Sequence, residues 1–170
     1  MSWLSERSRN GGLDQVVLPT GDGRLWLCGK HLIGPDPEGT LTRTGASLVV
    51  CLNDEAELVH RYPDYVRWLR DNADGRALWW PVYDMHAPGL DGIGSLIALV
   101  RARLDGGEGV IVHCGAGMGR AGSLAVAVLI AHGLSVVDAL ARVAASRPGA
   151  GPQTLAQELA LAEYAESLQK

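Results

Sequence analysis

The sequence predicts a single α/β domain with a central, mostly parallel β-sheet flanked by helices. Short apolar runs of the length of buried strands alternate with longer stretches in which apolar residues recur every three or four positions. A glycine-rich loop joins one of these predicted strands to a strongly apolar helix. The length of 170 residues fits one domain. Because ligands of such sheets bind at the carboxyl ends of the strands, we expect functional residues in the loops there.

The first half of the chain combines predicted strands with one interrupted helical stretch. Residues 21–23 carry two glycines between apolar runs, which predicts a β-hairpin. Residues 47–52 and 77–82 are short apolar runs that predict buried strands. Residues 55–72 have helical spacing, and Pro63 is expected to divide them into two helices.

The second half contains four predicted helices and one strand. Residues 92–105 form an amphipathic pattern closed by glycines, and residues 110–112 predict a strand. An apolar helix is expected over residues 120–132. Ser135 opens a capping pattern for a helix to about residue 146. Pro152 suits the first turn of a last helix that runs to about residue 168.

Composition and charge exclude several classes of protein. With 47% hydrophobic and 20% charged residues, the chain is globular and not disordered. A net charge of −4 without a basic cluster disfavours a nucleic-acid partner. The longest unbroken apolar run, residues 124–131, is far shorter than the roughly 20 residues that cross a bilayer. We therefore expect no membrane partner either.

The N-terminus and the cysteines predict where the protein works. Residues 1–12 predict a polar tail without a secretory signal, ahead of a domain over residues 13–170. The cysteines Cys28, Cys51 and Cys114 are odd in number and widely spaced, which argues against a disulfide framework and a CxxC metal site. These features favour a reducing cytoplasm and a protein without a metal or cofactor.

The chemistry lies in residues 113–123, where the glycine-rich loop precedes the apolar helix. Three glycines allow a tight loop, whose N–H groups and helix dipole form a concave binding site for an anion. Arg120 can hold two oxygens of that anion. Cys114 lies at the floor, where the same N–H groups would stabilise a nucleophilic thiolate. A merely buried cysteine beside a turn would leave Arg120 unexplained.

This segment resembles the His-Cys-x5-Arg signature of cysteine-dependent protein tyrosine and dual-specificity phosphatases. The matching positions are His113, Cys114, Ala116, Gly117, Gly119 and Arg120. The resemblance implies that Cys114 is the nucleophile and that His113 orients the loop as a supporting residue. The residues that it implies bind phosphate are Gly115, Ala116, Gly117, Met118, Gly119 and Arg120. With the segment 51–58, the chain looks most similar to the group of the cyclin-dependent-kinase-associated phosphatase.

The resemblance extends to a second segment. Residues 80–84, with Pro88 after them, look like the mobile acid loop of these enzymes. Asp84 then matches the general acid that protonates the leaving oxygen. The alternative is an ordinary turn aspartate beside Pro88 and Gly89. The place of Asp84 ahead of the cysteine favours the acid.

A third segment, residues 147–157, resembles the glutamine loop of the family. Gln153 and Gln157 match glutamines that position the hydrolytic water. Alternatively, both are ordinary polar residues in a first helical turn. The sequence favours the functional role for Gln153 and leaves the two alternatives for Gln157 evenly balanced.

One position departs from the family pattern. Ala121 stands where the family usually has Ser or Thr, whose hydroxyl helps to stabilise the departing thiolate. Losing one such donor costs about 10²-fold in rate, so hydrolysis of the phosphocysteine is expected to be slow. Ser123 is a supporting residue at most, because helical geometry turns it away.

Two further side chains have roles that the sequence leaves open. In some relatives a cysteine at the place of Cys51 forms a reversible disulfide with the catalytic cysteine. The alternative, a small buried apolar residue, is favoured here. An ion pair to Arg120 is expected from Asp54, Glu55 or Glu57, without preference among them.

Together these features predict a catalytic domain over residues 13–170 that acts as a metal-independent phosphomonoester phosphatase through a phosphocysteine intermediate. Its substrate would be a phosphorylated protein, through phosphotyrosine or with dual specificity, or a small phosphomonoester. Ala121 suggests one alternative, a phosphate-recognition module with weak turnover. An arsenate or sulfur-transfer enzyme with a similar cysteine loop is the other, and Asp84 and Gln153 count against it.

Overall fold

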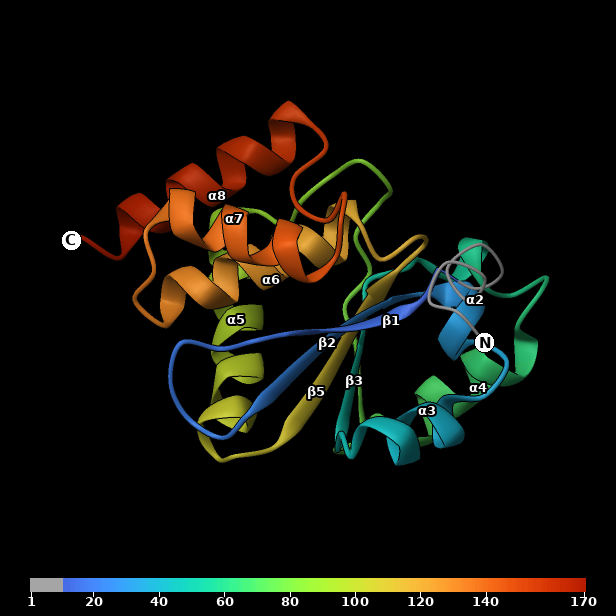
Figure 1. Cartoon of the computed structure of the whole chain (residues 1–170). Helices are drawn as coiled ribbons and strands as arrows, with labels where there is room; N and C mark the ends of the chain where they lie inside the picture. The colour runs from blue at the N-terminus through green and yellow to red at the C-terminus, as the bar shows by residue number, and fades with distance from the viewer. Residues whose placement is uncertain (1–10) are drawn as a thin grey trace.

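The computed structural model describes residues 11–170, without the side chains of Leu90 and Asp91. A five-stranded sheet with the order β1-β2-β5-β3-β4 forms the centre (Figure 1). Its strands are β1 (Leu13–Val16), β2 (Arg24–Gly29), β3 (Leu48–Cys51), β4 (Ala77–Trp79) and β5 (Gly109–Cys114). β1 pairs antiparallel with β2, and the other pairs are parallel. The predicted hairpin and the mostly parallel sheet are confirmed. Residues 1–10 of the expected polar tail lie outside the described residues.

Helices cover both faces of the sheet (Figure 1). On one side lie α5 (Leu90–Asp105), α6 (Gly119–Ala131), α7 (Val136–Ser146) and α8 (Leu155–Ser167). On the other side lie α2 (Lys30–Ile33), α3 (Pro37–Thr44) and α4 (Pro63–Asp71). Side chains alternate along each strand, so Val110, Val112 and Cys114 of β5 face the first group while Ile111 faces the second. The sheet therefore separates two apolar cores.

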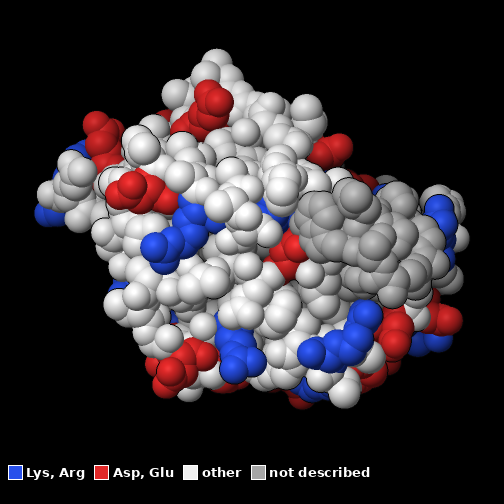
Figure 2. All heavy atoms as spheres, in the orientation of Figure 1, with Lys and Arg blue, Asp and Glu red and all other residues white. Residues whose placement is uncertain are grey.

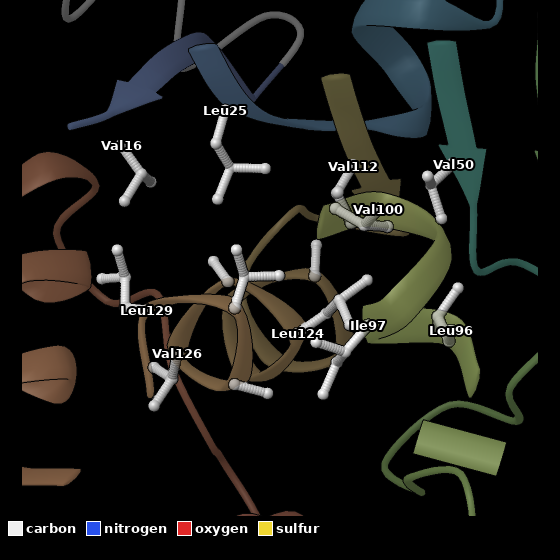
Figure 3. Packing of buried hydrophobic residues seen from close by; sticks show 14 of the residues in the cluster. Val16, Leu25, Val50, Leu96, Ile97, Val100, Val112, Leu124, Val126 and Leu129 are labelled. Atoms are coloured by element: carbon white, nitrogen blue, oxygen red, sulfur yellow. The ribbon is translucent and has the colours of Figure 1, made fainter. Parts of the chain in front are cut away.

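Helix α6 lies at the centre of the larger core. Apart from its last residue, Ala131, the whole helix is buried. Figure 3 shows Leu124, Val126 and Leu129 of this helix among side chains from the sheet and from α5. A helix that is apolar on all sides can only be stable in such a place. The loop at its N-terminus is consequently anchored on a rigid base.

Two short helices were not predicted from the sequence. α3 has clear signals at both ends: the Asp36 side chain accepts a hydrogen bond from Gly39 N at 2.8 Å, and Pro37 occupies the first turn. The helix ends at Thr44, and its C-cap is Gly45, with a φ of 69°. α2 has a single turn and follows β2 directly, so hydrophobic periodicity could not reveal it.

Three expected boundaries were wrong in detail. Within residues 55–72 only α4, which Pro63 begins, is an α-helix; the first part is a 3₁₀ turn, η1 (Glu55–Glu57). β4 ends at Trp79 because Pro81 has no N–H for the ladder, although Val82 N still donates to Leu52 O at 2.9 Å. Pro152 lies ahead of α8, whose N-cap is Thr154.

The surface and the helix lengths bear on the partner classes. Figure 2 shows acidic and basic side chains interspersed over one face of the molecule, with neither sign gathered into a large patch. Among residues 11–170, no helix combines the length and the apolar character that crossing a bilayer requires.

Candidate active site

The predicted anion loop connects the central strand to the buried helix. β5 ends at Cys114, whose side chain is buried, and α6 begins at Gly119. Gly117 has a φ of 72°, and a Cβ there would lie 2.4 Å from the Cys28 carbonyl oxygen, so only glycine fits. Lys30 N donates to Gly115 O at 3.0 Å and ties the loop to the end of β2. We call residues 114–120 the phosphate loop.

Arg120 is buried in the first turn of α6, and Glu57 holds it. Its two terminal nitrogens donate to the two carboxylate oxygens of Glu57, both at 2.8 Å. Nη1 also donates to Val82 O at 2.9 Å. The guanidinium lies above the loop, with Nη2 at 3.3 Å from the place that a Cβ on Gly115 would take. Its buried Nε has no hydrogen-bond partner among residues 11–170.

Glu57 resolves the choice among the three carboxylates. Asp54 and Glu57 cap η1 reciprocally, and Glu55 instead pairs with Arg70 at the surface. Burial raises the pKa of Glu57, but the hydrogen bonds from Arg120, Asp54 N and Asn53, together with the charge of Arg120, more than offset this and hold the pKa below its ordinary value. Glu57 is therefore a fixed negative charge that orients Arg120.

Asp84 lies at the mouth of the site. One of its carboxylate oxygens is 3.3 Å from Arg120 Nη2, and the side chain is 71% exposed. The same oxygen accepts a hydrogen bond from Met85 N at 3.0 Å. Met85 has a φ of 66°, a left-handed conformation that is unfavourable for a non-glycine residue. We call residues 80–89 the acid loop.

The two glutamines reach the site in different ways. A Cβ on Gly119 would lie 2.8 Å from Gln153 Oε1, so the exposed Gln153 side chain contacts the phosphate loop. Gln157 is buried, and its Oε1 accepts a hydrogen bond from Gln153 N at 2.8 Å. Its Nε2 donates to His86 O in the acid loop at 3.2 Å. Gln157 thus uses its amide to join two loops.

Thr154 makes a second connection between α8 and the acid loop, and the sequence analysis did not predict it. The Thr154 hydroxyl donates to Met85 O at 2.9 Å. As the N-cap of α8, Thr154 Oγ1 also accepts a hydrogen bond from Gln157 N at 3.3 Å. The Thr-x-x-Gln spacing was the available signal for this cap. The N-terminus of α8 therefore holds the acid loop near Arg120.

His113 supports the loop from within the smaller core. It is fully buried, and burial lowers its pKa to about 4, which keeps the ring neutral. Nε2 lies 2.6 Å from the Tyr65 hydroxyl, and Nδ1 lies 3.4 Å from Cys114 O. A neutral ring donates at one nitrogen and accepts at the other, so this chain runs from Tyr65 to the phosphate loop. Tyr65 was not predicted.

The structure separates Cys51 from Cys114. Along the paired strands, the side chain of Cys51 belongs to the smaller core and that of Cys114 to the larger core on the opposite face. Burial also raises the pKa of the Cys51 thiol above its ordinary value. The conformation described here does not bring the two sulfur atoms onto one face.

Ala121 and Ser123 are both buried in α6. Ser123 Oγ has no hydrogen-bond partner among the described residues. It lines a cavity of about 20 Å³ that His86 and Gln157 also line and Cys114 does not. Ala121 has no hydroxyl, and Ser123 lies two residues further along the helix.

The arrangement combines a buried thiol, a glycine-rich loop with a fixed guanidinium above it, and a carboxylate at the mouth. These groups suit attack on a tetrahedral anion with proton donation to a leaving group. Within residues 11–170 there is no cluster of three or more His, Cys, Asp or Glu side chains that could hold a metal ion.

Comparisons with known proteins agree with this geometry. Residues 40–134 match a protein-family model described as "Polymorphic toxin system, DSP-PTPase phosphatase". A search of curated protein sequences finds no match. The structure of Tk-PTP in its active form is 25% identical, with a TM-score of 0.69 over 89% of this chain and 96% of that one.

Two further solved structures show the same fold. Human DUSP28 is 25% identical, with a TM-score of 0.69 over 93% of this chain and 95% of that chain. The kinase-associated phosphatase is 17% identical, with a TM-score of 0.77 over 93% and 96% of the two chains. At 17% identity the last likeness concerns the fold alone.

Proposed function

The chain belongs to the DSP-PTPase phosphatase family of polymorphic toxin systems and is thus a hydrolase of the protein-tyrosine and dual-specificity type, and we propose that it cleaves phosphomonoesters without a metal, through a phosphocysteine. One observation carries the proposal. Glu57 holds the guanidinium of Arg120 against the phosphate loop, 3.3 Å from the place of a Cβ on Gly115, and Asp84 lies 3.3 Å from its Nη2.

In the first step, the Cys114 sulfur attacks phosphorus and the bond to the leaving oxygen breaks. The loop N–H groups and Arg120 hold the other phosphate oxygens, on which negative charge is spread. Asp84 gives its proton to the leaving alcohol or phenol. The products are the free alcohol and phosphate bound to Cys114.

In the second step, water attacks the phosphocysteine and the phosphorus–sulfur bond breaks. Gln153 positions the water and Asp84, now ionised, takes its proton. Inorganic phosphate leaves and the Cys114 thiolate is restored. Because Ala121 has no hydroxyl to stabilise the departing thiolate, we expect this step to limit turnover.

We propose a phosphorylated protein as the substrate. The exposed side chains of Tyr83 and Met85 flank Asp84 at the mouth of the site. They offer apolar contacts to residues beside a phosphorylated side chain. We also propose a cytoplasmic location, where a catalytic thiol stays reduced.

Ala121 supports a second candidate, a phosphate-recognition module with weak turnover. Such a module would use the same loop and Arg120 but would accumulate the phosphocysteine. Ala121→Ser is then expected to raise turnover by about tenfold or more. An arsenate or sulfur-transfer enzyme is less well supported, because Asp84 beside Arg120 suits protonation of an ester oxygen.

Hydrolysis of p-nitrophenyl phosphate in EDTA, from pH 5 to 8, tests the proposal. Wild type should hydrolyse the ester, and kcat of Cys114→Ser should be lower by at least about 10⁴-fold. Folded wild type without turnover, yet stabilised against heating by vanadate, would favour the recognition module.

A further inference from the structure

Arg147 is a buried cation that the proposed mechanism leaves without a role. It is the largest side chain among those with almost no solvent exposure, and it lies at the C-cap of α7. Burying a guanidinium is strongly unfavourable unless its donors are satisfied. The partners of Arg147 therefore show what the fold gains from this position.

All five N–H donors of the guanidinium find acceptors. Nε donates to Gly117 O at 3.0 Å, and Nη2 donates to Ala116 O at 2.8 Å. Nη1 forms an ion pair of 2.7 Å with Asp14, whose side chain is only 10% exposed. The remaining bonds reach the backbone oxygens of Gly11 and Gly12. Arg147 thus joins the segment around β1 to the phosphate loop.

Two of these bonds fix the direction of peptide groups in the phosphate loop. In a trans peptide the carbonyl and the following N–H point in opposite directions. The carbonyls of Ala116 and Gly117 point toward Arg147, so the N–H groups of Gly117 and Met118 point away from it. We propose that Arg147 is a positioning residue that turns these two N–H groups toward the substrate phosphate; this rests on the proposed function.

Because Asp14 pairs with Arg147, we expect Arg147 to act on the phosphate loop through the direction of its hydrogen bonds and not by adding positive charge to the site. The ion pair neutralises most of the charge of Arg147 inside the fold. A lysine would keep that charge but offers three donors at one point and no planar fork. Arg147→Lys therefore separates the directing role from the presence of a cation.

Arg103 provides a matched control at the opposite end of the sheet. It also donates to a backbone oxygen, Gly75 O at 2.6 Å, and pairs with an acidic residue, Glu108, at 2.9 Å. Arg103→Lys makes the same chemical change without contact to the phosphate loop. We expect tungstate affinity, measured by calorimetry, to fall at least tenfold in Arg147→Lys and to change less than twofold in Arg103→Lys.

Kinetics provide a second readout. In Arg147→Lys we expect KM for p-nitrophenyl phosphate to rise about tenfold, with a smaller loss in kcat, because the loop N–H groups already bind phosphate in the ground state. Asp14→Asn keeps the guanidinium but weakens its hold, and tungstate affinity should fall about threefold. If Arg147→Lys does not fold, the tungstate affinity of Asp14→Asn tests the positioning role of Arg147 in its place.

Three results would overturn the inference. One is a folded Arg147→Lys that binds tungstate as tightly as wild type. Another is an unfolded Arg147→Lys together with an Asp14→Asn that binds tungstate as wild type does. A wild type that binds no tungstate would overturn the inference and the proposed function together. Wild type that binds tungstate but hydrolyses no ester would contradict only the proposed function, and the affinity ratios would still decide the role of Arg147.

Discussion

The phosphate loop and the acid loop are held in contrasting ways. The phosphate loop lies between β5 and the buried helix α6, and Arg147 and Lys30 hold its carbonyl oxygens. The acid loop exposes most of its residues between 81 and 86, and Thr154 and Gln157 fasten it to α8. The phosphate loop is thus packed against the core, whereas the acid loop lies at the surface and is fastened to α8 by two hydrogen bonds. Changes to the first should alter anion binding, and changes to the second should alter proton transfer.

The largest effect is expected from a change at the phosphate loop. Arg120→Ala removes the cation above the loop and leaves Glu57 half-buried without its partner. We expect kcat/KM to fall about 10⁴-fold and the free energy of unfolding to drop by about 3 kcal/mol. Arg70→Ala, which breaks the exposed pair with Glu55, should cost at most about 1 kcal/mol. Equal losses in the two variants, by denaturant unfolding and steady-state kinetics, would contradict the distinction.

Changes to the acid loop should show their effect in the dependence on the leaving group. Asp84→Asn cannot donate a proton, so kcat/KM for phenyl phosphate should fall about 10³-fold. The loss should be much smaller for p-nitrophenyl phosphate, whose leaving group needs less protonation, and tungstate affinity should stay close to that of wild type. An equal loss with both esters would show that Asp84 is not the acid.

Acid should destabilise the fold at the base of the phosphate loop, through protonation of His113. Its pKa is about 4 in the fold and 6.5 unfolded, so the neutral ring favours folding above pH 6.5. This stability is lost as pH falls from 6.5 to about 4, by roughly 3 kcal/mol in total. Between pH 7 and 4, the free energy of unfolding of His113→Asn, measured by denaturant unfolding, should therefore fall by about 3 kcal/mol less than that of wild type.

The matched control for this titration is His60, which is exposed. His60→Asn should lose as much stability in acid as wild type does. If His113→Asn and wild type lose equal stability between pH 7 and 4, the acid sensitivity does not come from His113.

The smallest effect is expected from loosening the acid loop. Thr154→Val removes the hydrogen bond to Met85 O, which is worth about 1 kcal/mol. We expect a three- to tenfold loss for phenyl phosphate and almost none for p-nitrophenyl phosphate. Thr154→Ser keeps the hydroxyl and should restore wild-type behaviour. A loss that is independent of the leaving group would mean that Thr154 serves α8 and not the acid loop.

The sequence predicted the parts of the site that are contiguous in the chain. Residues 113–120 combine a strand end, glycines and a helix start, so local chemistry was enough to indicate an anion site. The partner of Arg120 was undecided because three carboxylates follow β3 closely, and only the capping of η1 turns Glu57 toward the site. The position of the carboxylate is a tertiary property.

Other residues could not be found from local patterns. Tyr65 reaches the site from α4, which carries no catalytic motif. Arg147 begins the segment that resembles the glutamine loop, but nothing in that pattern assigns it a contact with the phosphate loop. The separation of Cys51 from Cys114 depends on the register between β3 and β5, which the sequence does not specify. By contrast, α3 had a capping aspartate, a proline and a closing glycine, so its signals were present and were overlooked.

The phosphocysteine is the central claim, and rapid acid quenching of wild type during turnover of a phosphate-labelled ester tests it most directly. Peptide mass spectrometry should find phosphate on Cys114, approaching one equivalent per enzyme because Ala121 makes its hydrolysis slow. Cys114→Ser should carry none. Steady turnover by wild type with no phosphate on Cys114 at any quench time would contradict the account.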